Sequence, residues 1–529
     1  MPLKSQAPEA PARRLPLQRP QGAGEALSAK GALGFVISLF FISAITTTVL
    51  AQSGDMGYFT GISEGRRLPK TTEEIVKAAN GAKAAASLFV YKEVILLSGK
   101  PVVFEGMLEV TNEAPAQTSS GSYNKSLRVY PTASTAQGVS IMRTVNFLVN
   151  YRRENKQLIE DYSVTSWTET IVADSASFTL DQRLSSFDAS ILTETNPAVS
   201  YYRGDISRRA VYGSDSGPSS VDTMDSFYGY SSAWSATEAH KADVTVSAPD
   251  WQMHALLKPA VSVRKILQYS KNEPDSISFE GNYKELFQND SGLNYNILTV
   301  PRIYPDQPLS GTVSIPSRNT FEQLPSPDVS YLKGHFALED IRKLFSCKIL
   351  DGIPKHFQPN QQMTRGQFVT ALTKSIKLPV EPLPKETRNQ VQVIVFPDVT
   401  SSRKEYPYIM AAYRNGVAIG RNSGNFFIDS PLERQEAICI MIRSLGLEKL
   451  GLDPTVATYF NDNDDIASWA KRSAIAAARL GLVEKDDQGN LRPNDFVSKA
   501  EAAAMLSRFL DYMRNGLADD YSEHIVGFS

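Results

Sequence analysis

Alternating apolar and polar residues run through the first half of the chain. In residues 102–110 the side chains of Val102, Phe104 and Leu108 share one face, and residues 145–151 repeat the pattern. Successive side chains of a strand point to opposite faces of a sheet, so this period of two predicts β-strands. Further strand-like runs occupy residues 162–171, 177–180, 244–247, 277–280 and 311–315.

The region 52–330 is therefore predicted to be mainly β and sandwich-like. One stretch within it, residues 213–239, is rich in Ser, Gly and Asp, a composition typical of loops. We interpret this stretch as a long loop or an interdomain linker. The region then forms either one discontinuous domain or two smaller ones at 84–210 and 240–318.

The last third of the chain changes to a helical pattern, which is written three times. Each copy has an amphipathic first helix, a turn with glycine, a loop with an apolar anchor and a second helix. Such self-similar units indicate a repeat architecture. The copies occupy residues 334–378, 396–447 and 460–510, with basic residues at the corresponding positions Arg365, Arg434 and Lys499, and glycine-bearing turns at Asp351-Gly352, Asn415-Gly416 and Leu480-Gly481.

The second helix of each copy has a predicted start. Segments 364–367 and 498–501 satisfy the Ser/Thr-x-x-Glu/Gln capping box, in which both side chains pair with backbone N–H groups that the helix leaves unsatisfied. The second copy has Glu433 where the others have a hydroxyl, and residues 430–433 offer a box one turn earlier. Arg434 is therefore expected deeper in its helix than the basic residues of the other copies.

These three units resemble S-layer homology domains, over residues 332–513. The similarity lies in Thr364-Arg365 of the first copy, in the Phe-Pro-Asp-Val opening of the second and in the Ser-Trp-Ala of the third. The resemblance implies an all-α bundle of three repeats in a pseudo-threefold arrangement. The repeats are then 332–380, 395–450 and 458–513, followed by a tail, 514–529.

The resemblance also implies a ligand. Domains of this family bind secondary cell-wall polysaccharide, often carrying a pyruvate ketal, in grooves between repeats. Arg365 and Arg434 match the family's ligand-binding Arg, whereas Lys499 keeps the charge without the planar fork. A cation in the first helical turn would meet the ketal carboxylate beside exposed N–H groups and the positive end of the helix dipole. The predicted binding residues are Arg365, Arg434, Lys499, Thr364, Ser498 and Trp469, although core packing is the favoured interpretation of Trp469.

Residues 1–51 have the pattern of an export signal. Basic residues precede an apolar stretch at 32–45, and Val49-Leu50-Ala51 resembles a signal-peptidase site. We expect cleavage after Ala51, with an uncleaved membrane anchor as the alternative. Either outcome places the rest of the chain outside the cytoplasmic membrane.

The amino-acid composition excludes further classes of protein. The 529 residues are 42% hydrophobic and 21% charged, with 55 Lys and Arg against 57 Asp and Glu. These values exclude a disordered chain, and near-neutrality gives no support for nucleic-acid binding. Two cysteines are too few for a disulfide scaffold or a Cys-based metal cluster. Cys439 is expected to be a buried free thiol, with a Cys347–Cys439 disulfide as the alternative. No metal or cofactor is predicted, since the acidic run 461–465 lacks the glycine and distal Glu of a calcium loop.

The β-rich region contains no recognisable catalytic motif. It has no nucleophile elbow, phosphate-binding glycine loop or His-Glu-x-x-His. The carboxylates Glu105, Glu109, Asp161 and Glu169 would suit a glycosidase only if two of them lay about 5–10 Å apart. Solvated strand carboxylates are the favoured interpretation. The protein is therefore predicted not to be an enzyme.

Together these features predict an exported protein located at the bacterial cell wall or S-layer. Its repeats would bind secondary cell-wall polysaccharide or a peptidoglycan-linked glycan. Its β-rich part would be displayed as a structural or interaction module, with self-association in a surface layer. Two alternatives stay open: an anchored hydrolase acting on polysaccharide through residues 84–318, and a tether between outer membrane and peptidoglycan.

Overall fold

The computed structural model describes residues 58–65, 68, 86–112, 118–269, 283–299, 309–317, 319–380, 395–421, 424–451 and 457–521. The predicted export signal and the predicted strand at 277–280 lie outside these residues. No helix among the described residues is long and apolar enough to cross a membrane.

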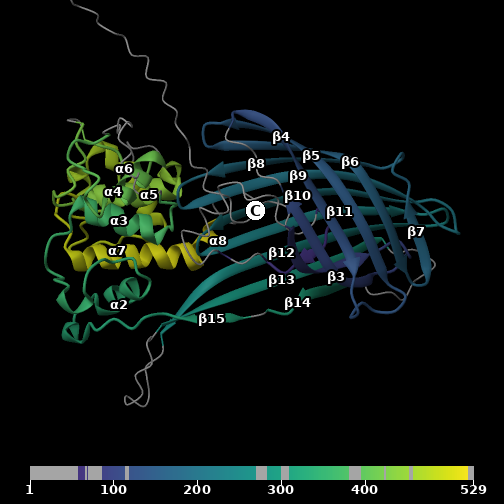
Figure 1. Cartoon of the computed structure of the whole chain (residues 1–529), viewed down its shortest axis with the longest axis horizontal. Helices are drawn as coiled ribbons and strands as arrows, with labels where there is room; N and C mark the ends of the chain where they lie inside the picture. Colours follow the sequence, from purple (N-terminus) through teal and green to yellow (C-terminus); the bar gives the residue numbers. More distant parts are fainter. Residues whose placement is uncertain are drawn as a thin grey trace, which may run out of the picture. The chain divides into compact units, whose positions relative to one another are not determined.

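The N-terminal region is mainly β, as predicted, and its described strands join in one sheet of fifteen (Figure 1). Neighbouring strands are antiparallel, and most follow each other in sequence order. The strands are β1 (Ile62–Ser63), β2 (Ala86–Ile95), β3 (Val102–Asn112), β4 (Ser120–Pro131), β5 (Ser140–Glu154), β6 (Gln157–Ala173), β7 (Ala176–Leu180), β8 (Ser186–Thr195), β9 (Val199–Gly213), β10 (Ser219–Ser232), β11 (Ser235–Ser247), β12 (Gln252–Tyr269), β13 (Tyr283–Thr299), β14 (Ser310–Ile315) and β15 (Thr320–Gln323). Both stretches 84–210 and 240–318 contribute strands to this sheet.

The interpretation of residues 213–239 as a loop or linker is wrong, because β10 and β11 form a long hairpin there. Glycines and aromatic rings lie opposite each other between β10 and its neighbour β9. Gly229 lies opposite Tyr202, and Phe227 lies opposite Gly204. A Cβ added to Gly229 would lie 2.4 Å from the Tyr202 ring. Composition alone suggested a loop, but cross-strand pairing of glycine with aromatic residues stabilises a strand.

Buried charges lie on the inner face of the sheet. The Arg143 guanidinium, 2% exposed, donates to Glu93 and Glu169 over distances of 2.6 to 2.9 Å. Two guanidiniums lie close to the Phe59 ring, that of Arg143 at 4.1 Å and that of Arg208 at 4.6 Å from its centroid. A buried charge is tolerated only when it is paired and hydrogen-bonded, so this network is part of the structural core.

The helical region consists of three two-helix repeats, as predicted. The first helix of each repeat packs on the second helix of the preceding one: α4 on α3, α6 on α5 and α2 on α7. This order closes the pseudo-threefold arrangement. The helices are α2 (Leu338–Ser346), α3 (Arg365–Ser375), α4 (Tyr406–Arg414), α5 (Arg434–Leu445), α6 (Ser468–Arg479) and α7 (Lys499–Asp511), followed by a π-helical turn (Tyr512–Gly516) and α8 (Leu517–Asp520).

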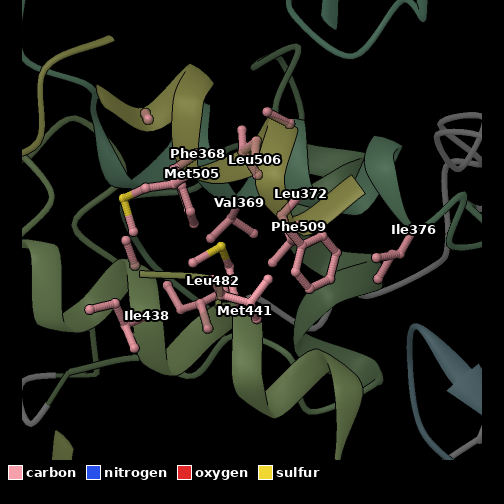
Figure 2. Packing of buried hydrophobic residues seen from close by; sticks show 14 of the residues in the cluster. Phe368, Val369, Leu372, Ile376, Ile438, Met441, Leu482, Met505, Leu506 and Phe509 are labelled. Atoms are coloured by element: carbon pink, nitrogen blue, oxygen red, sulfur yellow. The ribbon is translucent and has the colours of Figure 1, made fainter. Parts of the chain in front are cut away.

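The second helices of the three repeats share one apolar core. Leucine, isoleucine, methionine and phenylalanine side chains from all three gather there, and they are fully buried. Figure 2 shows them: Phe368 and Leu372 from α3, Ile438 and Met441 from α5, and Leu506 and Phe509 from α7.

Three backbone hydrogen bonds form a cycle just before these helices. Met363 N–H donates to Val497 O, Val497 N–H to Leu432 O and Leu432 N–H to Met363 O, at 2.8, 2.9 and 3.1 Å. Each of the three segments therefore donates a backbone hydrogen bond to one neighbour and accepts one from the other. The cycle fixes the three helix starts around one axis.

The strand region and the repeats share a buried cluster. The indole of Trp234, at the tip of the β10–β11 hairpin, donates to the Ser375 carbonyl at the end of α3. Ser235 donates to the Met513 carbonyl, and Tyr521 donates to the Tyr202 carbonyl. The described part of the predicted tail, 514–521, is thus helical and packed against the sheet.

Two local details differ from the sequence expectations. In the first repeat α2 ends at Ser346 and the first residue with positive φ after it is Lys348, at 57°, whereas the pair Asp351-Gly352 that was expected to end the helix lies further on, with Gly352 at φ 101°. Helix α5 begins at Arg434, so this residue is not deeper in its helix than its counterparts.

The two cysteines, Cys347 and Cys439, do not form a disulfide. Burial raises the pKa of the Cys347 thiol to about 12.

Candidate functional site

The predicted binding residues lie at the starts of the second helices. Thr364 and Ser498 act as N-caps: their hydroxyls accept hydrogen bonds from the N–H groups of Gln367 and Glu501, both at 3.2 Å. Arg365, Arg434 and Lys499 each occupy the first position of a helix. The capping boxes predicted for the first and third repeats are present.

The N–H groups expected beside these cations are already occupied. Arg365 N–H donates to Ser430 O, and Gly366 N–H donates to Ile428 O, both at 2.9 Å. In the same way, the first two N–H groups of α5 donate to the carbonyls of Asp495 and Pro493, and those of α7 donate to the carbonyls of Gln361 and Pro359. The loop of the next repeat passes across each helix start and supplies these carbonyls. The expectation that a ligand meets exposed helix N–H groups is therefore wrong at these positions.

The first basic residue, Arg365, is buried, with 5% of its surface exposed. Its Nη1 donates to Glu436 Oε1 at 3.1 Å and its Nη2 to the Ile419 carbonyl at 2.7 Å. The guanidinium also lies 5.0 Å from the centroid of the Phe426 ring. Burial lowers the pKa of Arg365, and the charge of Glu436 opposes that shift.

A simple rule relates the repeats. The basic residue at the first helical position pairs with the acid at the third position of the next repeat's helix. Arg365 pairs with Glu436, and Arg434 Nη2 donates to Glu501 Oε1. The corresponding third pair would be Lys499 and Gln367, in which lysine replaces the arginine and a neutral amide replaces the carboxylate.

In this third groove Lys499 Nζ donates instead to the side-chain oxygen of Gln361. Partial burial and the nearby charge of Lys404 lower the pKa of Lys499. The third groove thus differs from the other two in both its cation and its acid.

Two arginines that the sequence analysis did not single out lie beside the same acids. Arg421 donates through Nε and Nη2 to Glu436, at 2.7 to 3.0 Å. Arg492 Nη2 lies 3.6 Å from Glu501 Oε1. Both come from the loop between the two helices of a repeat, where no helical pattern draws attention to them.

Trp469 is 56% exposed, so the interpretation that favoured core packing is wrong. Helical spacing offered the signal: the buried face of α6 consists of Ala470, Ala474 and Ala477, and Trp469 falls beside it. The start of α6 is held against the start of α5, because Ala467 N–H donates to Gln435 Oε1 at 3.1 Å. The exposed indole therefore belongs to a helix whose start is held against the first turn of α5.

The carboxylates considered for hydrolysis are engaged with other groups. Glu169 binds Arg143 and the indole of Trp167. Glu105 pairs with Lys92, and Asp161 accepts a hydrogen bond from Ser190. Glu109 lies 3.7 Å from Arg128. Within the described ranges, no group of three or more His, Cys, Asp and Glu is placed to hold a metal ion.

The comparisons with known proteins agree with the repeat architecture. The model of the S-layer homology domain matches residues 332–369, 395–438 and 459–503. The chain therefore carries three S-layer homology domains, in line with the resemblance drawn from the sequence.

The curated relatives are surface proteins and enzymes that share these repeats. The surface-layer 125 kDa protein of Lysinibacillus sphaericus is 25% identical over 33% of this chain and 14% of its own length. The S-layer protein sap of Bacillus anthracis is 26% identical over 34% of this chain and 21% of its own. Exoglucanase XynX of Acetivibrio thermocellus is 26% identical over 35% of this chain and 16% of its own.

The chain thus spans less than a quarter of the length of each of these three relatives. The similarity falls on the S-layer homology part alone. It indicates a protein of the cell surface, associated with the cell wall.

Proposed function

We propose that this protein is held at the cell surface by its three repeats, which bind a carboxylate-bearing secondary cell-wall polysaccharide. The observation that supports this most strongly is the excess positive charge in the groove between the first and second repeats, where the guanidiniums of Arg365 and Arg421 share the single carboxylate of Glu436. The cations at the three helix starts, which oppose the helix dipole, mark the grooves between repeats, and Arg421 adds a partly exposed guanidinium to the first of these grooves. The exposed Trp469 offers a flat apolar surface at one such groove.

The N-terminal sheet is proposed to be a displayed structural or interaction module that self-associates in a surface layer. The buried Arg143, Glu93 and Glu169 are paired with one another, and the carboxylates considered for hydrolysis lie against other side chains. The exoglucanase relative gives no reason to expect enzymatic activity in this region, since its similarity to this chain lies in the repeats. Residues 84–318 are therefore proposed to be non-enzymatic.

The proposed function is tested by co-sedimentation of the full chain with purified cell walls. The full chain is required because the repeats and the sheet share a buried cluster. We expect binding to intact walls, weaker binding to walls whose pyruvyl groups have been removed, and none to walls stripped of the secondary polysaccharide. Equal binding to intact and stripped walls would favour a peptidoglycan tether, and no binding to any wall would contradict anchoring.

A further inference from the structure

We infer that Arg421 is the ligand-facing cation of the groove between the first and second repeats. Arg365, which the sequence motif indicates, is instead a positioning residue that holds Glu436 in place. This inference rests on the proposed function and names the residue of that site which meets the carboxylate of the glycan.

The exposure of the two arginines separates their roles. The Arg365 side chain is 5% exposed and the Arg421 side chain is 36% exposed. Two donors of Arg365 are taken by Glu436 and by the Ile419 carbonyl. A polysaccharide is too large to reach a cation buried in this way, so direct contact with Arg365 would require the groove to open.

The charges at this position leave one cation in excess. The Glu436 carboxylate, 11% exposed, accepts hydrogen bonds from both Arg365 and Arg421. One carboxylate balances one guanidinium, and the remaining positive charge lies on the solvent side. The Nη1 group of Arg421 donates to no acceptor within the described part of the chain. A charged planar fork with free donors is suited to a carboxylate.

The ring of Phe427 supports the Arg421 guanidinium, with its centroid 5.4 Å away. Stacking on an aromatic face leaves the in-plane N–H donors of a guanidinium available. Phe427 itself has a φ of 60°, an uncommon conformation for a bulky residue. Three backbone N–H groups of this turn, including that of Phe427, donate to the Asp398 carboxylate, and these hydrogen bonds hold the turn in place. The contacts with Phe427 and Glu436 therefore fix the position of the Arg421 guanidinium before a ligand binds.

The neighbouring groove provides a matched comparison. Arg492 is 47% exposed, but it lies within 3.3 to 3.7 Å of three carboxylates, those of Asp486, Asp495 and Glu501. With Arg434, two guanidiniums here face three carboxylates. This excess of negative charge disfavours an anionic ligand, so exposure alone does not make an arginine ligand-facing.

The test uses the full chain and oligosaccharides released from purified walls, either carrying their carboxylates or chemically reduced to alcohols. We expect Arg421→Gln to weaken binding of the carboxylated oligosaccharides at least tenfold and to weaken its salt dependence. Arg492→Gln is expected to change the affinity less than twofold. Arg365→Gln is expected to lower the melting temperature and the affinity together, while leaving the salt dependence of binding unchanged, because Arg365 makes no ion pair with the ligand.

Two results would overturn the inference in distinguishable ways. If the unaltered chain binds and Arg421→Gln binds equally well, Arg421 is not ligand-facing, although the proposed function stands. If Arg365→Gln loses the salt-dependent part of binding at an unchanged melting temperature, the two roles are reversed. If the unaltered chain binds neither form of the oligosaccharide, the proposed function fails and the inference fails with it.

Discussion

The indole Nε1 of Trp234 donates a 2.6 Å hydrogen bond to the carbonyl oxygen of Ser375. This bond joins the tip of the β10–β11 hairpin to the end of α3, and the indole is 2% exposed. The ammonium of Lys377 lies 4.6 Å and that of Lys265 5.5 Å from the Trp234 ring centroid. One side chain of the sheet is thus part of the core of the repeats.

We therefore expect Trp234→Ala to destabilise the full chain by about 3–5 kcal/mol, the usual cost of truncating a buried aromatic residue. Trp469→Ala is the matched control, because Trp469 is 56% exposed and should change stability by less than about 0.5 kcal/mol. Equilibrium denaturation in urea measures both. Equal effects of the two substitutions would contradict the shared core.

The buried network around Arg143 gives a second prediction. Arg143→Met leaves the Glu93 and Glu169 carboxylates buried without their cation, which should cost about 3–5 kcal/mol. Arg128→Met removes an arginine whose side chain is 58% exposed, 3.7 Å from Glu109, and should cost at most about 1 kcal/mol. Thermal melting of the two variants compares them. A loss for Arg143→Met no larger than that for Arg128→Met would mean that the network does not stabilise the sheet.

His240 makes the stability of the sheet dependent on pH. Burial by itself lowers the pKa of His240, but the charges and hydrogen bonds of Asp225 and Glu238 outweigh it and raise the pKa to about 10. The folded state therefore binds a proton that the unfolded chain releases near pH 6.5. The stabilisation is complete below about pH 6.5 and is lost as the pH rises towards about 10.

Comparison with His240→Gln isolates this contribution from other titrating groups. We expect the unaltered chain to exceed the variant in unfolding free energy most at pH 6, and the difference to shrink between pH 7 and pH 10. Denaturation curves at intervals of one pH unit measure it. A difference that stays constant over this range would show that His240 is not charged in the folded protein.

Asp398 holds the loop that carries Phe427. Its carboxylate accepts hydrogen bonds from the backbone N–H groups of Phe426, Phe427 and Ile428, at 2.6 to 3.2 Å. Asp398→Ala leaves these groups without their acceptor and should cost about 1–3 kcal/mol. Asp429→Ala, which removes a carboxylate that is 68% exposed, is the control.

The pH dependence of Asp398 runs in the opposite direction to that of His240. Burial favours a higher pKa for Asp398, but the backbone hydrogen bonds lower it below its ordinary value. Its contribution is present above about pH 4 and is lost as the pH falls further. If Asp398→Ala and the unaltered chain lose stability equally below pH 4, this account of the loop is wrong.

The repeats could be predicted from sequence because their signals are local. Capping boxes at Thr364 and Ser498 and helical spacing need only a few consecutive residues, and three copies reinforce each other. What surrounds Arg365 could not be predicted in this way. Its acid, Glu436, comes from the next repeat, and so do the carbonyls that occupy the helix N–H groups.

The strand region shows the same limit. Alternation found β3 and β5, whose buried faces are apolar, but strands such as β8 and β12 were not predicted although their buried faces also alternate. It also missed β10, where Phe227 lies opposite Gly204 and Gly229 lies opposite Tyr202 of the neighbouring strand. These complementary pairs become visible only when the register is known.

The most direct test of the account is the affinity of the full chain for purified wall polysaccharide, measured by calorimetry with the intact polymer and with a form whose carboxylates have been reduced. A carboxylate that meets a guanidinium fork in the first inter-repeat groove predicts binding of the intact polymer and at least tenfold weaker binding of the reduced one. Equal affinity for the two forms would contradict the central claim that the repeats recognise an anionic wall glycan.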